Sequence, residues 1–182
     1  ATANTLFSPL EGSDINDRIG RKVEVHKVKV SGYFICVAQA SQTTADNPTM
    51  IRMITFVDKQ TNGAQAQGEQ VMTSSGSAPT NPTTFMNLDT LGRFRVIKDI
   101  VKVMQNPNMC QNGVTTFEQG GLMVPFKYTC TFKQPIVMHF NSTNGGTVAD
   151  IVDNSFHIIA TASNVTLVPQ LQYSVRTCYK DL

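Results

Sequence analysis

The sequence has little charge, no tryptophan and no long apolar run. Charged residues make up 15% of its 182 residues, against roughly 25% in an average soluble protein. Thr, Asn, Gln and Ser are abundant in their place. The surface of the protein should therefore be largely neutral and polar. A surface of this kind favours self-association over a monomeric state.

The apolar runs are too short to cross a bilayer, and no apolar signal-peptide core follows the N-terminus. We therefore expect a soluble, intracellular protein without a membrane partner. The four cysteines are scattered without a C-x-x-C pair, so neither a zinc knuckle nor a disulfide framework is indicated. We expect buried free thiols at Cys36, Cys110, Cys130 and Cys178.

The net charge of +2 is too small to argue for nucleic-acid binding from totals. The length fits one domain over residues 1–182, with residues 1–20 as a lead-in segment. Segment after segment alternates apolar and polar residues, which predicts strands. The expected strands cover residues 22–40, 50–58, 69–73, 93–104, 126–134, 136–140, 156–162 and 167–179. Eight strands with almost no helix predict an all-β fold, a single jelly roll made of two four-stranded antiparallel sheets.

Local signals refine this prediction. The apolar phase of the first long strand switches near His26 and Lys27, which predicts a bulge. Pro135 is expected to separate two strands, and Asn62-Gly63 to form a turn. The spacing of Phe85, Leu88 and Leu91 predicts one or two turns of helix within a long loop. Phe94, Val96, Ile100 and Met104 are expected to share a phase with Lys98 and Lys102 on the next strand.

Catalytic motifs are missing. The sequence contains no G-x-S-x-G, HExxH, P-loop or G-x-G-x-x-G pattern, and each of His26, His139 and His157 falls within an expected strand. A histidine in a strand is far more often structural than catalytic. We therefore do not expect an enzyme.

Three stretches carry a resemblance. GSDINDRIGRKVEVHKVKVSG (residues 12–32), FVDKQTNGA (residues 56–64) and TTFMNLDTLGRFRVIKD (residues 83–99) are similar, in order and spacing, to segments of the capsid proteins of circular single-stranded DNA viruses of the CRESS group. The second resembles their "DKQ-x-NGA" turn and the third their "FRNL…RF.VL.D" segment, with Met86 where many relatives have Arg. The first is also similar to coat proteins of plant satellite viruses.

The resemblance implies a structural capsid protein of which about sixty copies close a T=1 icosahedral shell around single-stranded DNA. The first and last strands would pair in the sheet that faces the lumen. Sequence-independent phosphate contacts would come from Arg18, Arg21, Lys22, Lys27, Lys29 and Arg176, with Tyr33 for base stacking. The alternative is that these cations form a strand face that is simply exposed to solvent. We expect the remaining strand lysines to be charges on the outer surface or at subunit interfaces, namely Lys98, Lys102, Lys127 and Lys133.

Other expectations concern partners. Subunit contacts are expected in loops 81–91, 106–121 and 141–154. No cofactor is expected, although Asp150 with Asp153, or Asp14 with Asp17, are weak candidates for Ca²⁺ between subunits. Relatives carry an Arg-rich arm, so one is expected before Ala1. The protein would be found in virions and, during assembly, in the host cell interior or nucleus, and the host receptor is unknown. The alternatives are a satellite RNA-virus coat protein and a non-assembling jelly-roll module that binds a receptor or carbohydrate.

Overall fold

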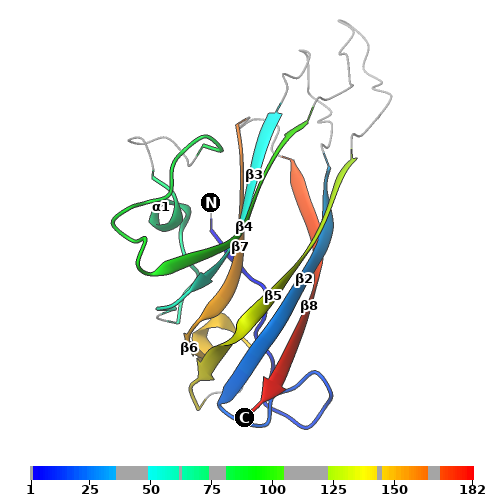
Figure 1. Ribbon diagram of the computed structural model, residues 1–182, viewed down its shortest axis with the longest axis vertical. Coiled ribbons are helices and arrows are strands. Elements are labelled where there is room, and N and C mark those ends of the chain that lie inside the picture. The colour runs from blue at the N-terminus through cyan, green and yellow to red at the C-terminus, as the bar shows by residue number, and fades with distance from the viewer. Residues whose placement is uncertain are drawn as a thin grey trace, which may run out of the picture.

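The described part of the chain forms an eight-stranded β-sandwich (Figure 1). The computed structural model describes residues 2–35, 49–61, 63–73, 81–104, 123–142, 145–163 and 169–182. The strands are β1 (Asn4–Thr5), β2 (Lys22–Ile35), β3 (Thr49–Asp58), β4 (Phe94–Met104), β5 (Met123–Phe140), β6 (Ile151–Asp153), β7 (Ser155–Ala162) and β8 (Gln170–Asp181). Two short helices join them, α1 (Gly68–Val71) and η1 (Val148–Asp150).

The strands form two antiparallel four-stranded sheets. One has the order β6-β5-β2-β8 and is called the β2 sheet below, and the other has the order β1-β7-β3-β4 and is called the β3 sheet. The predicted fold class is confirmed. The set of strands differs from the predicted one, since β1 and β6 were not expected. No helix in the described part of the chain is long and apolar enough to cross a membrane.

The pairing of β2 with β5 explains an error in the prediction. The expected bulge is present, as a register shift between Val25 and Lys27. Val25 pairs with Ile136 and Lys27 with Thr131, so Pro135 lies where the ladder is interrupted. A proline costs no ladder hydrogen bond there. β5 therefore continues to Phe140, and the predicted break at Pro135 is wrong.

The main core lies between the two sheets. Alternate residues of β2, among them Val23 and Val30, are fully buried there. A buried hydrogen bond between the hydroxyls of Thr55 and Tyr128 links β3 to β5 across the core. β3 is buried on both faces, because Ile54 belongs to a second cluster on the outer side of its sheet.

Two stretches cover that outer side, residues 63–73 and 81–93, and we call them the cover. Val71, Met72 and Met86 of the cover pack on Ile54 and Phe56 of β3. In Figure 1 the cover, with α1, lies to the left of the sheets. The other sheet carries no such layer among the described residues, so the two outer faces of the sandwich differ.

Local hydrogen bonds override two predictions in the cover. The predicted strand 69–73 is wrong, because α1 begins with a capping box in which Gln70 accepts the Gln67 backbone N–H at 2.9 Å. The predicted helical turns at 85–91 are also wrong, since that stretch forms non-helical turns. Gly63 has a φ of +67°, as expected for the Asn-Gly turn.

Three further outcomes concern single residues. Val96 is 38% exposed because a register shift between Thr55 and Phe56 changes the phase of β4. Cys178 is an exposed free thiol and Cys130 a half-buried one, so the expected burial is wrong for Cys178. Cys36, Cys110 and the loop 106–121 lie outside the described residues.

Candidate nucleic-acid interface

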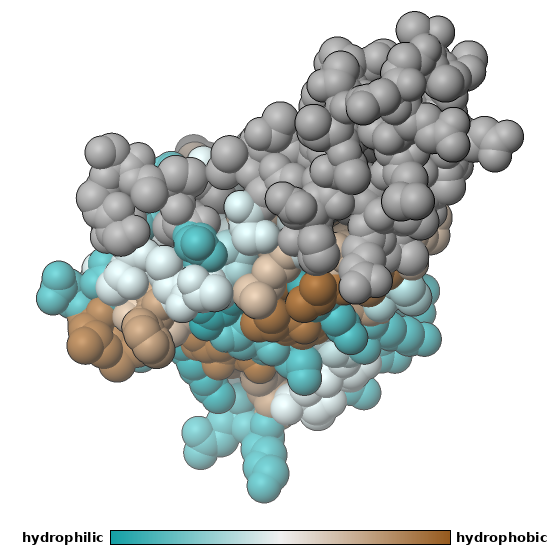
Figure 2. Space-filling view, turned by 90° about the horizontal axis from the view of Figure 1, so that it is seen from above, coloured by the Kyte–Doolittle hydropathy of each residue, from teal (hydrophilic) through white to brown (hydrophobic). Residues whose placement is uncertain are grey.

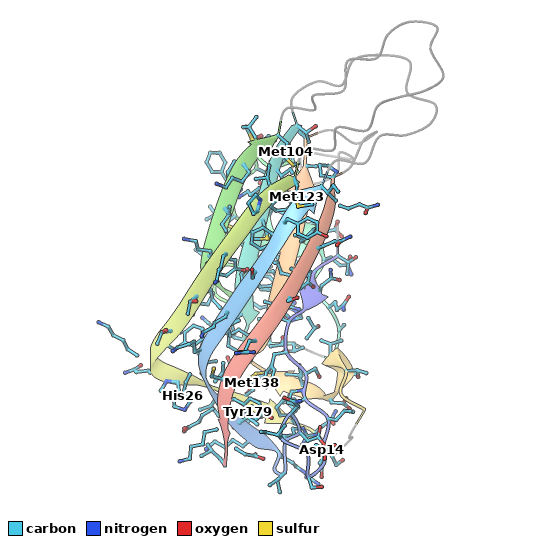
Figure 3. The ribbon with its side chains drawn as sticks, turned by 90° about the vertical axis from the view of Figure 1, so that its right-hand side faces the viewer. Asp14, His26, Met104, Met123, Met138 and Tyr179 are labelled. Carbon is cyan, nitrogen blue, oxygen red and sulfur yellow. The ribbon has the colours of Figure 1, made fainter. Side chains whose placement is uncertain are left out.

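The outward face of the β2 sheet brings together four of the residues proposed from sequence. Lys29 on β2 lies directly opposite Arg176 on β8, and Lys27 lies opposite Cys178. Residues directly opposite in antiparallel strands point to the same face. Tyr33 lies opposite Gln172 and donates its hydroxyl to the Gln172 side chain. Figure 3 looks onto this face of β5, β2 and β8.

The register adds a cation that sequence analysis had placed elsewhere. Lys127 on β5 lies opposite Ser31, two residues along from Lys29, and therefore on the same face. The alternation of Lys127, Thr129 and Thr131 was visible in the sequence. Its face was not, because that depends on how β5 pairs with β2.

These cations lack acidic partners nearby. Lys27, Lys29, Lys127 and Arg176 form no ion pair with any residue that the structure describes. Glu24 on the same strand lies near the ring of His26, at 3.9 Å. Lys29 and Arg176 are exposed and Lys27 is half-buried. The face therefore has a positive potential that an external anion can neutralise.

The prediction that Arg18 contacts phosphate is wrong. It is fully buried, pairs with Glu11 at 3.2 Å and donates to the Gly20 carbonyl at 2.7 Å. Its guanidinium also lies over the Phe140 ring, 4.5 Å from the centroid. These contacts hold the turn that leads into β2, so Arg18 is not available to phosphate.

Arg21 and Lys22 are exposed at the start of β2. Lys22 lies opposite His139, and the Arg21 carbonyl accepts the Phe140 N–H. Both therefore lie at the margin of the face, about half the strand away from Lys29 and Arg176.

A shallow pocket marks the other end of the face. It is lined by Ser31, Gly32, Tyr33, Gln172, Tyr173 and Ser174. A Cβ on Gly32 would lie 2.2 Å from the Gln172 carbonyl oxygen and 2.8 Å from the Tyr173 Cα. Glycine is therefore needed where β2 and β8 approach each other.

The acidic candidates for Ca²⁺ serve other purposes. The Asp150 carboxylate accepts the Thr147 N–H at 2.8 Å and caps η1, and Asp153 contacts His139 Nδ1 at 2.9 Å. The described residues contain no group of three or more potential metal ligands. This geometry does not support Asp150 with Asp153 as a shared cation site.

Asp14 and Asp17 lie in the turn before β2. An Asp17 carboxylate oxygen accepts the Asp14 backbone N–H at 3.3 Å. That contact closes the turn and engages the carboxylate of Asp17.

A serine–histidine pair lies within the described residues, but it is buried. Ser155 Oγ lies 2.6 Å from His157 Nε2, and both residues are fully buried. Burial lowers the pKa of His157 to about 4. The nearby Asp58 carboxylate is bound by Arg93 at 2.8 and 2.6 Å. Ser155 therefore offers no nucleophile that a substrate can reach.

The cover presents an apolar ridge to solvent. Phe85, Leu88 and Leu91 are 84%, 77% and 51% exposed. The ridge is fixed to α1, since Thr73 donates its N–H to the Phe85 carbonyl at 2.9 Å and Asn87 to the Val71 carbonyl at 3.0 Å. Figure 2 shows hydrophobic surface at the left, on the side where Figure 1 places the cover. An ordered, exposed apolar ridge is typical of a protein–protein contact.

Comparison with known proteins adds no family to this description, since no family model and no curated protein matches the chain.

Proposed function

We propose that this chain is a structural capsid subunit that assembles into a closed shell of about sixty copies and holds single-stranded DNA against the outward face of the β2 sheet. The observation that carries the proposal is the cluster of Lys27, Lys29, Lys127 and Arg176, four cations on one sheet face without an ion pair among the described residues. The resemblance of residues 12–32, 56–64 and 83–99 to CRESS capsid segments supports it.

The chemistry of this face suits a backbone rather than a base sequence. Each cation that contacts phosphate releases condensed counterions, which gives a salt-dependent, sequence-independent attraction. Tyr33 is the one aromatic residue that the described part of this face offers for base stacking, and its hydroxyl is already bound by Gln172. Electrostatic attraction should therefore dominate over stacking.

The two outer faces have different tasks in this proposal. The basic face of the β2 sheet turns to the lumen, and the covered face of the β3 sheet turns away from it. The ridge of Phe85, Leu88 and Leu91 falls within the loop 81–91 that was expected to contact neighbours, and it supplies apolar area for a contact between copies. Loop 141–154 is a second contact region in this proposal.

The first experiment measures mass and nucleic-acid content together. Light scattering coupled to size exclusion gives the mass, and the absorbance spectrum gives the ratio of nucleic acid to protein. A shell of sixty subunits of 19.9 kDa weighs roughly 1.2 MDa. A nuclease-resistant peak of this mass supports the proposal, and a monomer across salt and calcium conditions overturns it in favour of a non-assembling binding module.

Charge reversal tests the face itself. Lys27→Glu with Lys29→Glu should lower the retained nucleic acid strongly while the subunit stays folded, because it replaces two phosphate contacts with two repulsions. The matched control is Lys98→Glu with Lys102→Glu, the same charge change at two exposed positions of β4. Equal nucleic-acid content in both sets of intact particles would refute the assigned face.

Digestion identifies the cargo. If DNase removes the nucleic acid extracted from the particles and RNase does not, the DNA assignment holds. The reverse result replaces it with the satellite RNA-virus alternative, in which the same cations contact RNA phosphates.

A further inference from the structure

His157 lies beside Phe56, on which the cover packs, in a polar cluster that neither the proposed DNA contacts nor the apolar ridge requires. Its Nε2 contacts Ser155 Oγ at 2.6 Å, and Ser155 Oγ contacts Thr61 Oγ1 at 2.7 Å. Thr61 precedes the first stretch of the cover. The imidazole therefore connects β7 to the point where the chain leaves the β3 sheet to form the cover.

Uncharged groups surround most of the ring. Phe56 of β3 stacks on it, with ring centroids 5.5 Å apart, and Thr5 of β1 pairs with it in register. The charged groups that act on the ring are Asp58 at the end of β3 and Arg93 just before β4. Arg93 binds both carboxylate oxygens of Asp58, so this ion pair offers little net negative charge to a protonated imidazole.

The closed structure has no place for a second ring proton. His157 is fully buried, and its Nδ1 has no hydrogen-bond partner among the described residues. In the neutral ring, Nε2–H can donate to Ser155 Oγ. Nδ1 then carries only a lone pair, and leaving a lone pair without a partner costs less free energy than leaving an N–H without an acceptor. Protonation would place a charged N–H in an apolar, buried site without an acceptor, which costs more than the loss of a neutral hydrogen bond.

Opening of the cover relieves this cost. The cover is held by a small apolar cluster, which includes Val71 and Met72 and is separate from the main core between the sheets. It is also held by the Arg93–Asp58 ion pair and by a hydrogen bond from Arg52 to the Thr84 carbonyl, and these contacts break when it lifts. We propose that His157 makes the cover acid-labile: at acidic pH the segment 63–73 with 81–93 lifts from the β3 sheet and lets the imidazole take up a proton, while the sandwich itself stays folded. The proposal holds for the isolated subunit and does not depend on the proposed function.

The direction of the pH effect on opening follows from the difference in the pKa of His157 between the closed and open states. The pKa of His157 is about 4 in the closed structure, against 6.5 for an accessible histidine. Above about pH 6.5 neither state is protonated, so the opening equilibrium does not depend on this group. Between about pH 6.5 and 4 only the open state binds the proton, and the opening constant rises up to tenfold per pH unit. At about pH 5 it should be about 20-fold larger than at neutral pH.

Hydrogen exchange measures the opening. Protection factors of the Ala3 and Lys59 amides, which donate to the Ala66 and Arg93 carbonyls of the cover, should fall about 20-fold from neutral pH to about pH 5, while amides of the central strand β2 keep theirs. His157→Gln retains a neutral group for Ser155 and should abolish the fall. His139→Gln, which changes an exposed histidine beside Asp153, should leave it intact and serves as the control.

A second measurement needs no variant. The chain has three histidines, so an NMR titration of the wild-type imidazoles resolves His157 directly, and its ring should stay neutral in the closed state down to about pH 4. A His157 that titrates near pH 6.5 without loss of protection overturns the proposal. So does an equal loss of protection in the cover and in β2, or an undiminished fall in His157→Gln.

Discussion

Lys29 on β2 and Arg176 on β8 lie directly opposite each other on the outward face of their sheet. Like charges at directly opposed positions destabilise a sheet, and neither cation has an acidic partner among the described residues. The protein therefore maintains an unfavourable pair of like charges on an exposed face, where a neutral residue would be more stable. A bound phosphate removes the repulsion, so the pair is suited to an anionic ligand.

Arg176→Gln should separate stability from binding. Because it removes one of two facing cations, it should raise the free energy of unfolding by about 0.2–1 kcal/mol at low salt, and the gain should vanish at high salt. Affinity for single-stranded DNA should fall, with a log–log salt dependence shallower by about 0.7–0.9. Urea unfolding and a salt titration of binding measure the two effects. Lys102→Gln, opposite Ile51, is the control, and the same response in both variants would contradict the assignment.

Arg18→Ala should lower the stability of the protein and leave DNA binding by the folded protein unchanged. The buried guanidinium binds Glu11, the Gly20 carbonyl and the Phe140 ring, so its loss should lower the free energy of unfolding by roughly 2–4 kcal/mol. Arg21→Ala, three residues along and exposed, should change it by less than about 0.5 kcal/mol and should reduce DNA binding instead. Chemical denaturation of the two variants tests this. If Arg18→Ala keeps the stability of the wild type but binds DNA weakly, Arg18 contacts DNA after all.

The strand faces were predictable because alternation is a property of each strand by itself. In β2 and β8 the alternation in the sequence matches the structure, since Val28 and Val30 are buried in the core and Lys29 and Arg176 are exposed. Pro135 was misread because its effect depends on the partner strand. The bulge in β2 leaves a gap in the ladder at that point, and no local signal in β5 announces it.

The site was less predictable than the fold, because charge in a sequence does not indicate burial. Arg18 and Lys29 are both cations in the same basic stretch of sequence, yet Arg18 is fully buried and Lys29 is exposed. The acid partner Glu11 was visible seven residues earlier, but the Phe140 ring was not, since β5 brings it from far along the chain. Lys127 joined the face for the same reason, through pairing across the sheet.

Tyr128 should make the sandwich sensitive to alkali. Burial raises the pKa of Tyr128 to about 12, against an ordinary value of 10, although the hydrogen bond with Thr55 acts in the other direction. The unfolded chain therefore loses this proton first, and the free energy of unfolding should fall as the pH rises from about 10 to 12. Stability curves of the wild type and Tyr128→Phe measure the difference. An equal alkaline loss in both would assign the effect to other groups.

The ridge on the cover should be needed for assembly and not for folding. Phe85 and Leu88 are 84% and 77% exposed, so Phe85→Ser with Leu88→Ser should change the free energy of unfolding by less than about 0.5 kcal/mol per site. If the ridge packs against a neighbouring copy, the double variant loses apolar area at every such contact, and the distribution by light scattering should shift from particles to free subunits.

Val101→Thr with Val103→Thr is the matched control for the ridge. These two side chains are 52% and 59% exposed on β4, so the pair removes exposed apolar surface elsewhere while keeping a branched residue suited to a strand. Particles should persist in this variant. Loss of particles in both variants would mean that total apolar surface drives association, whereas full assembly of the Phe85 and Leu88 variant would remove the ridge from the subunit contact.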